Sequence, residues 1–183
     1  MFNNIINMAK KAVKTGLKGT GETGEITLNV LKNLTSETIK NSGGLVKEGI
    51  KLTSSVIRGT ILGISEIGAS VVKMMKDVVR VTIEGAMETG IGQNDAVRGA
   101  VSQAIKSAKE KGVNVSEAAL QAVMGAVSAV KNKGGDVKEA SRVAISAAVE
   151  AAKEINNEVK DGVKKTLSSG IEGAQKIIDS LKE

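Results

Sequence analysis

The chain contains no cysteine, no histidine and no proline, and its only aromatic residue is Phe2. Without cysteine it has no disulfide, thiol redox site or thiolate metal site. Without histidine as well, zinc sites of the usual ligand types and Ser-His or Cys-His nucleophile pairs are excluded. We therefore expect a non-enzymatic protein with no catalytic residue, no metal ligand, no cofactor and no small-molecule substrate.

Long apolar runs and a signal segment are missing too. No stretch reaches the length of an apolar transmembrane helix, and the N-terminus lacks a compact apolar signal core with a small-residue cleavage site. We expect a cytoplasmic protein, either free or peripheral to a membrane or granule.

The charge is positive, with a formal net charge of +6, and the cations are mostly lysine. Proteins that read specific nucleic-acid sequences rely on arginine forks and stacking aromatics. The sequence therefore predicts no specific nucleic-acid partner, and nonspecific DNA association is a weaker alternative.

A 22-residue repeat runs through nearly the whole chain. The segment Val56–Ile61 aligns with Val78–Ile83, and the same offset continues without insertion. Two columns, four residues apart, are predicted to be helix-packing positions. The first is Leu17, Ile39, Ile61, Ile83, Ile105, Val127, Val149 and Ile171. The second is Val13, Thr35, Ile57, Val79, Val101, Val123, Ile145 and Leu167.

The spacing within each unit predicts an all-α protein. Apolar columns at i, i+3, i+4 and i+7 form one face of a helix. A punctuating column accepts the left-handed conformation that ends helices, and it reads Gly24, Val46, Gly68, Gly90, Gly112, Gly134 and Asn156. We therefore expect short antiparallel helices separated by glycine turns, arranged as a bundle or a solenoid. The rival is a set of long continuous helices with an eleven-residue sub-period.

The clearest units lie in the C-terminal half. Helices are predicted near 94–111, 114–132, 136–156 and 158–182, whereas the segment from Val56 to Met87 allows a longer helix through Gly68. The expected organisation is a basic amphipathic helix at 1–18, a glycine-rich linker at 19–25, more apolar repeats at 26–92, and alanine-rich helix-turn repeats at 93–183.

The N-terminal helix has a character of its own. Its apolar side is a candidate membrane or partner face, with basic residues on the other side. Packing of that apolar side on the next helix is the competing interpretation, and the one we favour. The face comprises Phe2, Ile5, Ile6, Ala9, Val13 and Leu17, with Lys10, Lys11, Lys14 and Lys18 opposite.

Other motifs are absorbed by the repeat. The acids Glu66, Glu88, Glu110 and Glu154 share one column and Asp95, Glu117, Glu139 and Asp161 another, which indicates a solvated helix face or helix-start charges. The Gly-rich segment 19–24 lacks the ending and the preceding strand of a phosphate loop and is interpreted as a linker. Small residues spaced four apart, such as Gly59 and Gly63, predict close helix packing.

In period and composition the chain resembles the exchangeable apolipoproteins, synucleins, perilipins and phasins, which use 22- or 11-residue amphipathic helices. The resemblance implies a coat on a membrane, lipid droplet or polymer granule, which is the alternative function. The leading hypothesis is a structural scaffold that self-associates as a homo-oligomer or anchors a larger assembly, because array ends that stay apolar favour association.

Overall fold

The computed structural model describes residues 1–17, 25–43 and 46–181, and these fold entirely into helices and the turns between them. The all-α prediction is confirmed. The described helices are α1 (Phe2–Leu17), α2 (Glu25–Asn41), α3 (Val46–Glu66), α4 (Val71–Met87), α5 (Gln93–Glu110), α6 (Val115–Asn132), α7 (Val137–Ile155), α8 (Asn157–Gly170) and α9 (Ala174–Ser180).

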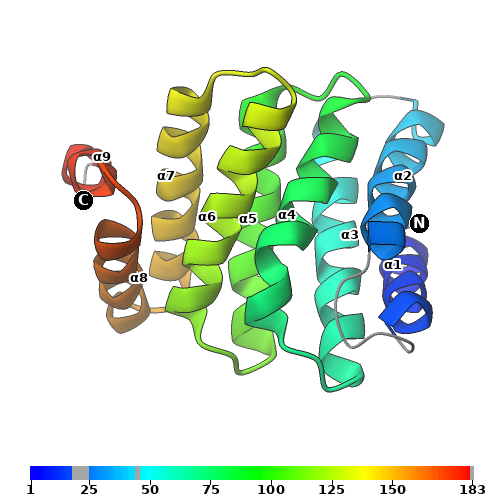
Figure 1. The fold of residues 1–183 in the computed structure, drawn as a ribbon, viewed down its shortest axis with the longest axis horizontal. Helices are drawn as coiled ribbons and strands as arrows, with labels where there is room; N and C mark the ends of the chain where they lie inside the picture. The colour runs from blue at the N-terminus through cyan, green and yellow to red at the C-terminus, as the bar shows by residue number, and fades with distance from the viewer. Residues whose placement is uncertain (18–24, 44–45, 182–183) are drawn as a thin grey trace.

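The helices form two layers. Each helix packs against its neighbour in sequence and against the helix two places along, so that α1, α3, α5 and α7 make one layer and α2, α4, α6 and α8 the other. Figure 1 shows the stack running lengthwise between the two chain ends. Since layer mates are two repeats apart, the structure is a solenoid of helical hairpins.

Glycine turns separate the helices at the predicted phase. Gly68, Gly90, Gly112 and Gly134 all have a positive φ and lie 22 residues apart. Because α3 ends at Glu66 and α4 begins at Val71, the longer helix through Gly68 is wrong, and so is the continuous-helix rival.

Side-chain caps start three of the four helices that follow these turns, whereas α5 begins after Gly92 without one. Ser70, Asn114 and Asp136 each accept a hydrogen bond from the backbone N–H three residues on. This bond satisfies one of the N–H groups that have no partner within a helix. The helices expected near 94–111, 114–132 and 136–156 are confirmed to within one residue at each end.

Two members of the punctuating column behave differently from glycine. Val46 is the first residue of α3, and among the described residues of the turn before it Gly43 is left-handed, with a φ of 84°. Asn156 is extended, with φ −173° and ψ 173°, and its side chain caps α8 by accepting the Val159 N–H. The left-handed turn expected at these two positions is therefore wrong, and Gly24 lies outside the described residues.

The helix predicted over 158–182 is also wrong. The helix α8 ends at Gly170, a turn follows in which Gly173 has a φ of 78°, and the short α9 begins at Ala174. Figure 1 shows α9 end-on, so it runs across the direction of its neighbours. It packs on α7 and α8 with Ala174 and Ile178 buried, and therefore covers the C-terminal end of the first layer.

The core lies between the layers and runs the length of the stack. Of the packing columns, Val127 and Ile171 are half-buried, and Thr35 and all the other aliphatic members are buried. Glycines allow the helix backbones to come close within a layer. A Cβ added at Gly59 of α3 would lie 2.2 Å from the Ile6 carbonyl oxygen of α1.

Candidate partner-binding surface

A ladder of ion pairs crosses the exposed side of the layer formed by α1, α3, α5 and α7. Each rung joins a cation to a glutamate on the next helix of the layer. The rungs are Lys14 to Glu66 at 2.9 Å, Arg58 to Glu110 at 2.9 Å, Arg98 to Glu150 at 3.1 Å and Lys106 to Glu154 at 2.7 Å. The first three share an offset of 52 residues, so the repeat sets their register.

The acids of the repeat column Glu66, Glu88, Glu110 and Glu154 lie at helix C-termini, not at helix starts. Glu66 and Glu110 are the last residues of α3 and α5, and Glu88 directly follows α4. A carboxylate there is disfavoured by the helix dipole, and the cation from the neighbouring helix offsets this. The interpretation of this column as helix-start charges is therefore wrong, whereas Asp95, Glu117 and Glu139 do lie in first turns.

Two lysines of α1, Lys10 and Lys14, pair with Glu66. Hydrogen bonds from Lys10 and then Lys14 hold the pKa of its carboxyl below the usual value of 4.5. At Glu88, burial raises the pKa, but hydrogen bonds from Lys133 and Lys32 outweigh that effect and leave the pKa lowered. Glu66 thus connects α3 to α1 in one layer. Glu88 connects the end of α4 to Lys32 of α2 and to Lys133 at the end of α6 in the other layer.

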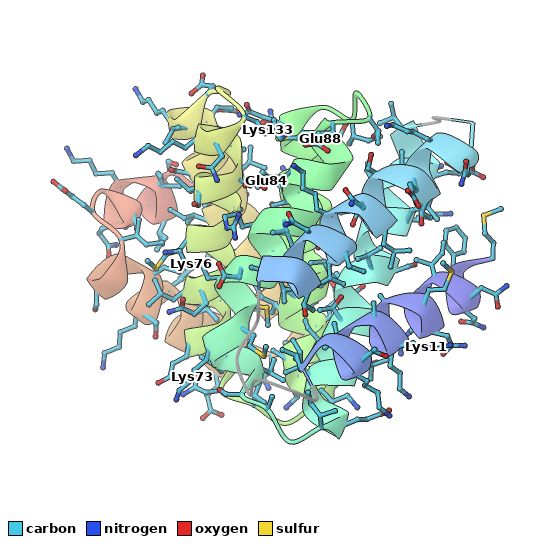
Figure 2. The ribbon with its side chains drawn as sticks, turned by 45° about the vertical axis from the view of Figure 1, so that its right-hand side comes forward. Lys11, Lys73, Lys76, Glu84, Glu88 and Lys133 are labelled. Atoms are coloured by element: carbon cyan, nitrogen blue, oxygen red, sulfur yellow. The ribbon has the colours of Figure 1, made fainter. Side chains whose placement is uncertain are left out.

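The other layer carries a partly buried polar network on α4 and α6. Glu84 is 7% exposed and accepts hydrogen bonds from Asn132 at 2.8 Å and Arg80 at 3.4 Å. Figure 2 shows Glu84 and Glu88 near Lys133, with Lys73 and Lys76 farther down α4. Because its carboxylate is satisfied by these donors, Glu84 acts as a link between helices.

The basic helix expected at the N-terminus is α1. Ile5, Ala9, Val13 and Leu17 are buried in the core, and Ile6 is half-buried. Phe2 stays 37% exposed. Lys18 lies outside the described residues. The apolar side of α1 therefore packs on α3, and membrane binding by this helix stays a prediction.

The described lysines of α1 differ in whether they make an ion pair. Lys10 and Lys14 pair with Glu66, whereas Lys11 makes no ion pair with the described residues. A shallow hollow of about 360 Å³ beside them is lined by polar and basic residues of this helix alone, among them Asn7 and Thr15.

A groove with an apolar floor crosses α1, α3 and α5. Two adjoining hollows, of about 340 and 180 Å³, share the lining residues Ile50, Ser54 and Gln103. Phe2 and Ile6 extend the apolar lining onto α1, and cations of α3 and α5 surround it. We call this the α1–α3–α5 groove; its charged lining residues are Lys51, Arg58, Asp95, Arg98 and Lys106.

This groove is only partly visible in the sequence. The sequence pattern predicts that Phe2 and Ile6 lie on the candidate face of α1, but Ile50 lies in no packing column and no sequence signal indicates it. The arginines could have been found from the shared offset of 52 residues to a glutamate. That offset indicates an ion pair only if helices two places apart in the sequence are known to pack side by side in one layer.

The described residues show no group of three or more acidic side chains placed to hold a metal ion. Within the same residues, no helix is long and apolar enough to cross a membrane. The Gly-rich segment 19–24 lies outside them.

Comparison with known proteins supports the fold. No family model matches the chain, and no curated protein matches it. The crystal structure of the de novo designed helical repeat protein DHR7 is similar over 97% of this chain and 94% of that one, with a TM-score of 0.55 and 21% identity. At this identity the similarity establishes a helical-repeat fold.

Proposed function

We propose that the chain is a non-enzymatic scaffold that anchors a partner protein in a larger assembly through the α1–α3–α5 groove. The observation that supports this is the groove itself, which joins three successive helices of one layer and exposes the only aromatic side chain, Phe2. Concave apolar surface with a few polar groups around it is the usual form of a binding site. Aromatic side chains are also enriched among the residues that dominate protein interfaces.

The charges around the groove favour a particular partner. Arg58, Arg98 and Lys106 pair with exposed glutamates, and such surface pairs contribute little to stability, so that a ligand carboxylate can replace them. Lys51 is exposed and makes no ion pair with the described residues. A segment with apolar anchors flanked by acidic residues matches this surface.

The architecture also suits a scaffold. Stacked hairpins give a continuous core and a long, regular surface, which is how repeat proteins hold partners. The side chains available for chemistry are few, because histidine and cysteine are absent from the sequence.

A tagged copy in its native cell tests the proposal. With the tag at the C-terminus, wild type is expected to co-purify a discrete partner. The double variant Phe2→Ser/Lys51→Glu is expected to reduce its yield at least tenfold, because an apolar anchor and a rim cation are lost together. The matched control is Lys73→Glu, the same charge reversal on an exposed residue of α4 outside the groove.

Equal recovery from the double variant and the wild type would overturn the proposal. Far-UV circular dichroism of the purified variants shows that the fold is intact, since both substituted side chains are exposed. Equal loss from both variants would point to nonspecific charge binding, which also contradicts the groove as the site.

A further inference from the structure

The α1–α3–α5 groove crosses the helices that form it. Its lining comes from three successive helices of one layer, which lie about 10 Å apart, so the groove is about 20 Å long. An extended segment covers that distance with about six residues, at about 3.3 Å per residue, whereas a helix needs about 13. The length alone is compatible with either conformation of a bound segment, and the lining side chains distinguish the two.

Two serine hydroxyls in the lining have unused hydrogen-bonding capacity. Elsewhere on α3, Thr53 and Thr60 each donate to the carbonyl oxygen four residues before, at 2.8 Å. Ser54 instead donates across to the Gly99 carbonyl oxygen of α5, at the long distance of 3.4 Å. Ser102 of α5 makes no hydrogen bond with the described residues. Both hydroxyls are half-buried in the groove and are able to bond a ligand.

A carboxamide adds a third uncharged group. Gln103 lines both hollows and donates from its amide nitrogen to the Ser107 hydroxyl at 3.0 Å, and its carbonyl oxygen makes no bond with the described residues. The backbone N–H and C=O groups of an extended segment need partners, whereas a helix bonds its own. Uncharged donors and acceptors along the groove therefore favour an extended ligand over a helical one.

The charges of the groove favour acidic side chains in that ligand. Four cations but a single carboxylate, that of Asp95, line the two hollows. The side chains of Arg58, Arg98 and Lys106 are 44%, 49% and 48% exposed, so their charged ends reach solvent above the apolar floor. A ligand that places carboxylates away from the floor is complementary to this arrangement.

The alternation of an extended chain fits both parts of the surface. Successive side chains of such a segment point in opposite directions. Every second side chain then contacts the half-buried Ile6 and Ile50, and those between them reach the exposed cations. Recognition of an extended segment combines main-chain hydrogen bonds, which give affinity, with contacts of alternate side chains, which give specificity.

We propose that the segment bound in the α1–α3–α5 groove is extended, is about six residues long and alternates apolar with acidic side chains. Its backbone bonds Ser54, Ser102 and Gln103, and its carboxylates pair with the cations of the groove. This inference rests on the function proposed for the groove and adds the conformation and chemistry of the bound segment.

Binding of synthetic peptides to the full chain tests the inference. The probe is a fluorescein-labelled peptide of about eight residues that alternates leucine and glutamate, followed by fluorescence anisotropy in low-salt buffer. It is expected to bind with a Kd below about 100 μM. Three comparison peptides are expected to bind at least tenfold more weakly. They are the same residues with all leucines before all glutamates, an alternating leucine–lysine peptide, and a longer leucine–glutamate peptide patterned as an amphipathic helix.

Removal of the two serine hydroxyls tests the backbone bonds. Ser54→Ala/Ser102→Ala is expected to weaken binding of the alternating peptide at least fivefold, because two hydrogen bonds are lost. The fold tolerates both changes, since alanine favours a helix. Ser128→Ala, a half-buried serine of α6 outside the groove, is the matched control and is expected to bind as wild type does.

Absence of binding by the alternating peptide at about 1 mM would overturn the inference. Equal or tighter binding of any comparison peptide, or unchanged binding by the double serine variant, would overturn it too. These results leave the anchoring function of the groove in place, because that function is tested by co-purification with Phe2→Ser/Lys51→Glu. Equal co-purification would instead overturn the anchoring function whatever the peptides do, so the two failures are distinguishable.

Discussion

At the scale of single residues, glycine performs two tasks in this chain. At Gly68, Gly90, Gly112 and Gly134 it supplies the left-handed conformation that ends a helix. At Gly59 it lets α3 approach the backbone of α1. The first task is visible in the sequence because the spacing is regular. The second is visible only as small-residue spacing, which does not say which helix is approached.

The close approach of α3 to α1 at Gly59 predicts that a methyl group added there destabilises the fold. Gly59→Ala places a Cβ against the Ile6 carbonyl oxygen, so α1 must move away, and the free energy of unfolding is expected to fall by about 1–3 kcal/mol. Gly162→Ala is the control, because there the Cβ meets only the flexible Ser116 side chain at 2.9 Å and alanine favours the helix by about 0.5–1 kcal/mol. Urea unfolding followed by far-UV circular dichroism measures both; equal stability of the two variants would contradict the contact.

At the scale of helices, the sequence predicts where each helix begins and ends better than which helices pack against each other. A 22-residue period defines each helix and turn, but it is equally consistent with several ways of stacking them, because every helix has two apolar flanks. The alternate-helix layers, and the groove around Ile50 with them, follow from packing between residues far apart in sequence. The repeat does not predict the break before α9, because Gly170 and Gly173 do not lie in the 22-residue column of turn glycines.

The ion pairs of Glu66 that link α1 to α3 predict that the stability of the fold depends on pH. Hydrogen bonds from Lys10 and Lys14 lower the pKa of Glu66 in the folded protein, so the unfolded chain binds more protons as the pH falls below about 4.5. The stabilisation from Glu66 is therefore complete above pH 4.5 and is lost as the pH falls through the lowered pKa. Glu66→Gln is expected to lose less stability than wild type between pH 7 and pH 3.

Urea midpoints at the two pH values check this expectation. Glu172→Gln serves as the control, since Glu172 is exposed and makes no ion pair with the described residues. An identical acid sensitivity in wild type and Glu66→Gln would show that the lysines of α1 do not stabilise this carboxylate.

At the scale of the whole molecule, the chain is a stack of hairpins with two unlike ends. The C-terminal end of one layer is covered by α9, and the N-terminal end is exposed, charged and partly apolar. The sequence predicts that apolar ends of the array favour association. At the C-terminal end this argument does not apply, because the aliphatic residues of 171–181 are buried or half-buried within the chain. The long faces between the ends, and the groove above all, are the surfaces on which a scaffold would hold its partner.

A site-specific cross-link tests that central claim most directly. A photo-reactive amino acid at Ser54, inside the α1–α3–α5 groove, is compared in native cells with one at Ser128, a similarly half-buried position on α6. We predict one discrete protein adduct from Ser54 that is absent from Ser128, and that mass spectrometry maps to an apolar segment flanked by acidic residues. The same adducts from both positions, or none from Ser54, would contradict the scaffold function proposed for this groove.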